Sequence, residues 1–161
     1  EHPDIPVYLG ANTGHGKRGH PRLERGQSNK SAFLLTHFFP EEISGSLLVP
    51  PKVEHAFVDE AIEVIVEFPD GYEPEGGSIW WIFDRSPDGS PRYLSEPIPD
   101  DHFAEMHYDE RRGVWVAEIE LDAHADQIDF FSNYLNIIEH NGRAYETYLS
   151  SPYTRVVLPK R

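Results

Sequence analysis

Apolar and polar residues alternate along most of the chain beyond residue 48. Over residues 61–68, the side chains of Ile62, Val64 and Val66 fall on one side and glutamates on the other. A period of two is typical of a β-strand with one buried face. Similar patterns predict further strands over residues 53–57, 78–84, 92–94, 103–108, 114–121, 127–139, 145–149 and 154–158. The second two-thirds of the chain is therefore expected to be a series of strands.

Turn sequences separate these segments. Pro69-Asp70-Gly71 and Ser86-Pro87-Asp88-Gly89 are typical turns, and Asn141-Gly142 favours a type I′ hairpin. Short strands at this spacing, joined by hairpin-length connections, indicate an antiparallel two-sheet structure. We predict an all-β fold, an immunoglobulin/fibronectin III-like antiparallel β-sandwich over residues 48–161. Trp81 would lie in its core, although the cysteine pair of immunoglobulin domains is missing.

Residues 1–47 have a different pattern, which predicts a short N-terminal strand–loop–helix extension. Residues 5–9 form a short apolar segment, and residues 10–26 form a basic, glycine-rich loop. Ser28 is suited to cap a helix that runs to about Phe39, where Pro40 would end it. Residues 41–51 are expected to link this segment to the sandwich.

The composition narrows the function. The chain has 161 residues, 39% of them hydrophobic, and a formal net charge of −14. That charge argues against nucleic-acid binding, which requires a basic surface. No run approaches the roughly 18 apolar residues of a membrane span. The absence of cysteine excludes disulfides, thiol nucleophiles and thiolate zinc sites, and we predict no cofactor.

The N-terminal segment resembles the C-terminal end of a serine α/β-hydrolase domain. Asn12-Thr13-Gly14-His15-Gly16 is similar to the loop that carries the catalytic histidine, and residues 31–39 are similar to the closing helix. Esterase-like proteins of the PhoPQ-activated pathogenicity-related type follow that helix with an immunoglobulin- or fibronectin-like domain. The resemblance implies that His15 is the general base, and it favours a secreted or periplasmic location.

The chain departs from that family at the nucleophile. A serine hydrolase needs a Gly-x-Ser-x-Gly elbow, and the nearest stretch, Gly26-Gln27-Ser28-Asn29-Lys30, ends in lysine. The leading interpretation is therefore a non-catalytic accessory or substrate-positioning domain that works with a hydrolase-like domain or chain. A small hydrolase that uses His15 is a further alternative.

A second alternative is a module that binds a carbohydrate or a cell-surface polymer. Trp80, Tyr134, Tyr145 and Tyr148 are the candidate ligand-binding residues. Of two adjacent strand residues one faces each way, so Trp80 would face outward if Trp81 faces the core. A glycan platform requires exposed rings, whereas burial of these residues would indicate core packing.

Histidine and aspartate residues gather around residues 100–109 and 122–126. Asp122, His124 and Asp126 would share one side of an extended segment, an arrangement from which calcium or zinc sites are built. Solvated loops explain the same residues more simply. We therefore predict no metal site.

Overall fold

The structure is a computed structural model that describes residues 7–11, 21–85 and 97–160. In these residues a helix and a short 3-10 turn precede nine strands. The elements are α1 (Pro21–Phe38), η1 (Pro40–Glu42), β1 (Ile43–Ser44), β2 (Lys52–Val58), β3 (Ala61–Glu67), β4 (Gly76–Phe83), β5 (Phe103–Asp109), β6 (Val114–Glu120), β7 (Gln127–His140), β8 (Arg143–Ser150) and β9 (Thr154–Val157).

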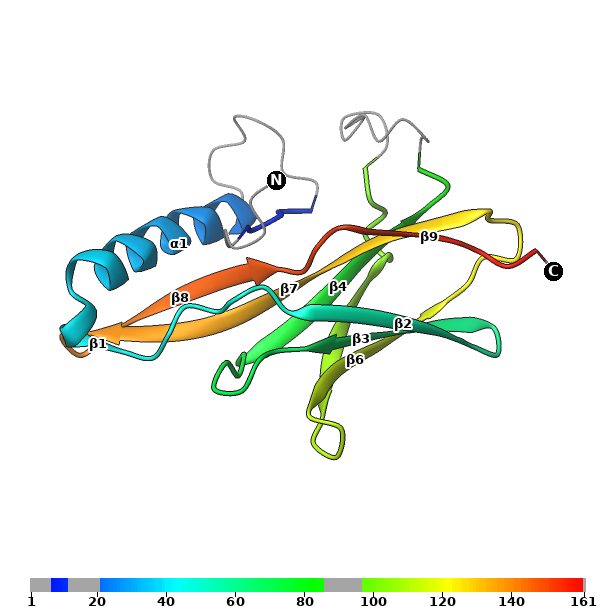
Figure 1. The fold of residues 1–161 in the computed structure, drawn as a ribbon. Coiled ribbons are helices and arrows are strands. Elements are labelled where there is room, and N and C mark those ends of the chain that lie inside the picture. The colour runs from blue at the N-terminus through cyan, green and yellow to red at the C-terminus, as the bar shows by residue number, and fades with distance from the viewer. Residues whose placement is uncertain (1–6, 12–20, 86–96, 161) are drawn as a thin grey trace.

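The strands form two antiparallel layers that β5 connects (Figure 1). One layer has β7 at its centre, with β4 on one side and β8 and β9 on the other. The second layer runs β5-β6-β3-β2. The first half of β5 pairs with β4 and its last residues, from His107 on, pair with β6. β5 therefore leaves the first layer and joins the second.

The predicted fold class, an all-β antiparallel sandwich with a helical N-terminal extension, is confirmed. The order β2-β3-β6-β5 opposite β4-β7-β8 is also the strand order of immunoglobulin-type sandwiches. Closer kinship with the immunoglobulin or fibronectin III families stays a prediction. The hairpin at Asn141-Gly142 has φ angles of 51° and 73°, which agrees with the predicted type I′ turn.

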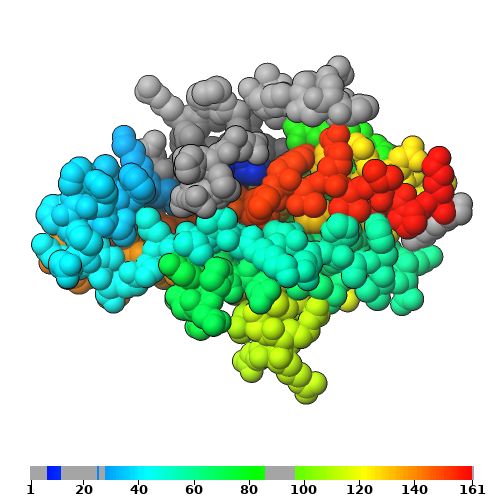
Figure 2. Space-filling model, viewed as in Figure 1, coloured from blue at the N-terminus to red at the C-terminus, as the bar shows by residue number. Residues whose placement is uncertain are grey.

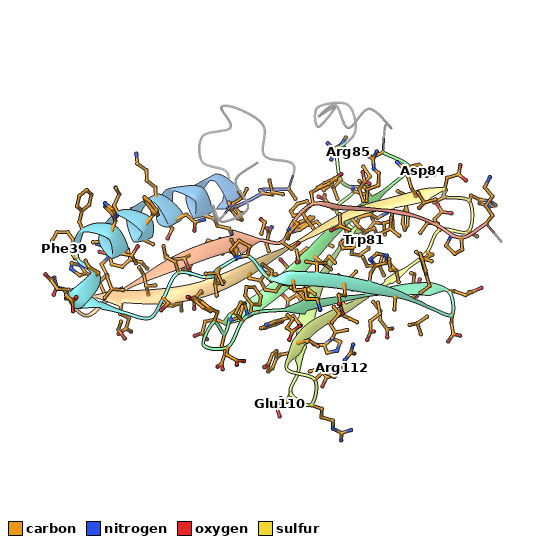
Figure 3. All side chains as sticks on the ribbon, in the orientation of Figure 1. Phe39, Trp81, Asp84, Arg85, Glu110 and Arg112 are labelled. Carbon is orange, nitrogen blue, oxygen red and sulfur yellow. The ribbon has the colours of Figure 1, made fainter. Side chains whose placement is uncertain are left out.

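The main core lies between the two layers. Ile62, Val64 and Val66 of β3 are fully buried, as their alternation predicts, and they form one cluster with Ile79 and Phe130 of the opposite layer. Trp81 packs against this cluster from β4, as predicted (Figure 3). Burial of these apolar side chains supplies most of the driving force for folding.

The helix begins earlier than the sequence suggests. α1 starts at Pro21, so the prediction of a loop through residue 26 and of Ser28 as the cap is wrong. Proline is well tolerated at the first helical position, and the good helix formers that follow outweigh the cost of Gly26. Ser28 instead lies inside the helix, where its hydroxyl donates to the carbonyl oxygen of Glu146. The predicted helix end before Pro40 is confirmed.

α1 packs along β8 and covers part of its free edge (Figure 1). The amide nitrogen of Asn29 donates to the Tyr148 carbonyl at 2.6 Å, and its amide oxygen accepts from the Tyr148 N–H at 2.6 Å. One side chain thus replaces a missing strand partner, which protects an exposed sheet edge.

The segment of residues 7–11 lies against the outer face of the first layer. No strand is formed over residues 7–10, in contrast to the prediction. The segment is held instead by isolated bonds, since Ser150 N–H donates to Val7 O at 2.8 Å and Leu9 N–H donates to Ser150 Oγ at 2.7 Å. The strand predicted over residues 92–94 lies outside the described residues.

Candidate functional site

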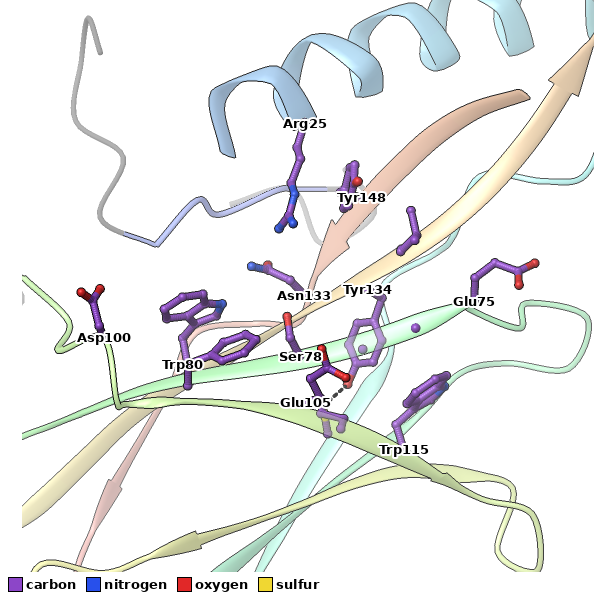
Figure 4. Close-up of a pocket in the computed structure, with 15 residues that line it drawn as sticks. Arg25, Glu75, Ser78, Trp80, Asp100, Glu105, Trp115, Asn133, Tyr134 and Tyr148 are labelled. Carbon is purple, nitrogen blue, oxygen red and sulfur yellow. Dashed lines mark hydrogen bonds between the residues drawn. The ribbon is translucent and has the colours of Figure 1, made fainter. Parts of the chain in front are cut away.

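A hollow of about 700 Å³ opens beneath the start of α1, on the outer side of the first layer (Figure 4). Side chains or backbone from α1, β4, β5, β6, β7 and β8 reach it. Its walls consist of Arg25, Glu75, Gly76, Gly77, Ser78, Trp80, Asp100, Phe103, Glu105, Met106, Trp115, Asn133, Tyr134, Leu135 and Tyr148. The volume lies in the range of small-molecule sites.

Two adjacent glycines of β4 shape the hollow. A Cβ added to Gly76 would meet no heavy atom within 4 Å, so the absence of a side chain there leaves open space. A Cβ on Gly77, which faces the core, would lie 2.8 Å from Cε1 of Tyr134 and 3.2 Å from Cε3 of Trp115. Gly76 therefore opens the hollow, whereas Gly77 lets Tyr134 and Trp115 close against the strand below it.

Aromatic rings line much of this space. The Trp80 and Phe103 rings lie 4.6 Å apart with an interplanar angle of 47°. Tyr134 packs at 6.0 Å from Trp115, and its hydroxyl donates to Met106 Sδ at 3.1 Å. Tyr148 forms the opposite wall (Figure 4). The rings are held by neighbours and are thus ordered before any ligand arrives.

Polar groups are set among the rings. Arg25 extends from α1 with its guanidinium 5.0 Å from the centre of the Tyr148 ring, a cation–π contact. Ser78 is half-buried, whereas Glu75 and Glu105 are exposed at the rim. With Asp100, the lining thus contains three carboxylates and one guanidinium, so the hollow carries net negative charge.

Burial raises the pKa of the Tyr148 hydroxyl to about 12, and its hydrogen bond to Glu146 adds to that shift. Burial also raises the pKa of Tyr134. Both phenols therefore stay protonated at neutral pH.

Three of the four predicted ligand-binding residues meet at the hollow. Trp80, Tyr134 and Tyr148 all line it. Tyr145 lies on β8 three residues from Tyr148, so it faces the opposite side of the strand, where Arg143 sits 5.2 Å from its ring centre. Ligand binding by these residues stays a prediction.

Burial limits how much of the Trp80 ring is available for stacking with a ligand. It is 7% exposed, because Ala11, Ile98 and Phe131 pack over it in a second apolar cluster. Tyr134 is fully buried. An open platform of flat, exposed rings is therefore absent at these two positions, and Trp80 and Tyr134 contribute to the floor and wall of a concave site instead.

Other site residues were not identified from the sequence. Phe103 and Trp115 lie in two of the predicted strands, and both line the hollow. Arg25 lies in the stretch predicted to be a loop, but it belongs to α1 and reaches the hollow from there. A strand pattern shows which face a residue occupies, but it does not show which helix covers that face.

The other predicted sites have different outcomes. His15 lies outside the described residues, so its role as a general base stays a prediction.

Within the described ranges no group of three histidine or acidic residues is placed to hold a metal ion. Asp122 instead accepts a hydrogen bond from the backbone N–H of His124 at 2.9 Å, as in a solvated turn. No helix in the described part of the chain combines the length and apolar character needed to cross a membrane.

Comparisons with known proteins add little to this geometry. No family model matches the chain, and no curated protein matches it significantly. One solved structure, the crystal structure of a carbohydrate-binding module family 56 β-1,3-glucan binding domain, shares 13% identity at a TM-score of 0.36. The match covers 62% of this chain and 95% of that one. A similarity of this size carries no argument about function, which has to come from the site itself.

Proposed function

We propose that this chain is a binding module for a neutral glycan, which it holds in the hollow beneath α1. The observation that carries the proposal is the mixture of preformed aromatic walls and polar side chains in one open cavity of about 700 Å³. No set of groups for covalent chemistry is required for such a role.

The chemistry of a sugar ring suits this mixture. A pyranose has apolar C–H groups on its faces and hydroxyl groups around its edge, so it stacks on aromatic rings and exchanges hydrogen bonds at its periphery. Tyr148 and the Trp80–Phe103 pair supply the rings. Arg25 supplies donors, and Glu105 accepts from hydroxyl groups.

Charge favours a neutral ligand over an acidic one. The hollow carries three carboxylates and one guanidinium, and the chain has a net charge of −14. Both would repel a polyanion and slow its approach. A neutral polysaccharide is unaffected by this repulsion, and its hydroxyl groups can use the carboxylates as acceptors.

The test is titration calorimetry of the purified chain against laminarin, xylan, mannan, cello-oligosaccharides and chito-oligosaccharides, with polygalacturonate as the acidic comparison. We expect saturable binding to at least one neutral glycan and none to polygalacturonate. Gly76→Val would place a side chain in the open space, and Tyr148→Ala would remove one wall. Each should weaken binding about tenfold or more, equivalent to about 1.4 kcal/mol.

Tyr145→Ala is the matched control, because it removes the same side chain from the same strand on the opposite face. It should leave the affinity unchanged. Absence of binding to every neutral glycan by a correctly folded chain would refute the proposal. Equal losses in Tyr145→Ala and Tyr148→Ala would place the ligand elsewhere.

A second candidate function is the accessory domain of a larger hydrolase-like protein. The observation in its favour is the exposed apolar surface of α1, where Phe33, Leu34 and Phe38 are 56%, 42% and 66% exposed. Such a helix face is typical of contact with another folded domain. A native protein whose mass and reading frame include a preceding domain with a Gly-x-Ser-x-Gly elbow would support this candidate. A native mass equal to that of the 161 residues would overturn it.

A further inference from the structure

A second hollow, of about 480 Å³, lies between the connection from β3 to β4 and the β5–β6 hairpin. Figure 2 shows these two segments side by side, with the hairpin projecting from the body of the molecule. The walls of this second hollow consist of Phe68, Pro69, Asp70, Gly71, Tyr72, Glu73, Pro74, Tyr108, Gly113 and Trp115. It is also rich in aromatic and proline side chains.

Trp115 belongs to the walls of both hollows. Its ring lies 5.6 Å from that of Tyr108 in the second hollow and 6.0 Å from that of Tyr134 in the first. The two spaces are therefore neighbours that share one wall. A row of rings, Tyr134, Trp115 and Tyr108, continues from one to the other.

We propose that the second hollow is a further subsite for the same glycan chain, so that the module recognises an extended oligosaccharide and not an isolated sugar. This inference rests on the proposed function. Asp70 and Glu73 are exposed at its rim, as Glu75 and Glu105 are in the first hollow. Both hollows thus offer rings to sugar faces and carboxylates to hydroxyl groups.

Continuity across Trp115 favours one long ligand over two separate small ones. Because the two hollows share Trp115, an extended chain of linked sugar units would have to pass only this residue to occupy both. Once the first hollow is occupied, the linked units reach the second at high effective concentration. Affinity should therefore increase with chain length until both hollows are filled.

The experiment measures the affinity of the purified chain for a series of oligosaccharides, from disaccharide to hexasaccharide, cut from the neutral glycan that it binds. We expect the hexasaccharide to bind at least about tenfold more tightly than the disaccharide. Tyr108→Ala should lower the affinity for the hexasaccharide by about tenfold and that for the disaccharide by less than about twofold. Tyr108→Phe keeps the ring and should retain most of the affinity.

Phe57→Ala is the matched control. Phe57 on β2 is 44% exposed, close to the 47% of Tyr108, and it lines neither hollow. Thermal melting of each variant checks its fold, and exposed residues of this kind should alter stability little.

The possible results separate the two proposals. If no glycan of any length binds, the proposed function fails and the subsite fails with it. If short and long oligosaccharides bind equally and Tyr108→Ala has no effect, only the second subsite is overturned. A loss for the hexasaccharide alone supports both.

Discussion

The two adjacent glycines of β4 should respond in opposite ways to the same substitution. Neither has a backbone angle in the left-handed region, so alanine fits the backbone at both positions. At Gly76 the added Cβ would meet open space, whereas at Gly77 it would lie 2.8 Å from Cε1 of Tyr134. Gly77→Ala therefore tests how tightly Tyr134 is held.

The magnitude follows from the contact distance. Carbon atoms pack at about 3.5–4.0 Å, so the ring would have to retreat by roughly 0.7 Å or more. Tyr134 is fully buried, with Phe68 4.8 Å away and Met106 bonded to its hydroxyl. These contacts oppose a shift of the ring, and overpacking of this kind costs about 1–3 kcal/mol.

Replacing glycine also stabilises the protein by restricting the unfolded chain, by about 0.4–1 kcal/mol. This contribution applies to both variants. Gly76→Ala should therefore be slightly more stable than the wild type. The difference between the two variants isolates the overpacking cost at Gly77, about 1–3 kcal/mol.

Urea unfolding followed by circular dichroism measures this difference from the midpoints at constant slope. Each kcal/mol corresponds to about 2–4 °C in melting temperature for a chain of this size. A double-mutant cycle with Tyr134→Leu should show that Gly77→Ala costs little once the ring is gone. Equal stability of Gly76→Ala and Gly77→Ala would refute the reasoning.

Further predictions concern the buried polar contacts. The Asp129 side chain is fully buried and accepts two hydrogen bonds from Arg155, at 2.6 Å and 2.7 Å. Arg155→Ala should therefore destabilise the fold by about 3 kcal/mol. An unchanged urea midpoint would contradict this prediction. Asn29→Ala should cost about 1–2 kcal/mol of stability, because two backbone groups of Tyr148 lose their partner. Hydrogen exchange at the Tyr148 amide should accelerate, and continued protection of this amide from exchange would show that it has another partner. Because burial raises the pKa of Tyr134 and Tyr148 in the folded state, their stabilising contribution is full below about pH 10 and is lost at higher pH. The urea midpoint of Tyr134→Phe should thus decline less between pH 9 and 11 than that of the wild type. An equal decline of the midpoint in both proteins would argue against a raised pKa of Tyr134.

The strands were predictable from the sequence because a strand's face is a local property. The period-two pattern of residues 61–68 identifies β3 to within a residue, and the positive φ angles at Asn141-Gly142 follow from residue type. The start of α1 was not predictable in this way. Ser28 is equally suited to a cap and to a contact with the edge of β8, and only the neighbouring strand decides between them.

The alternating pattern thus determined that the chain forms a sandwich, in which the half-buried Trp81 packs against the main core. Tertiary structure decided that Trp80 is covered by Ala11 and Ile98, residues distant in the sequence, and that Arg25 faces Tyr148. The physical reason is the range of the interactions. Alternation along a strand reflects burial of one face, whereas a cavity forms where separate elements meet, and its position depends on β5 passing from one layer to the other.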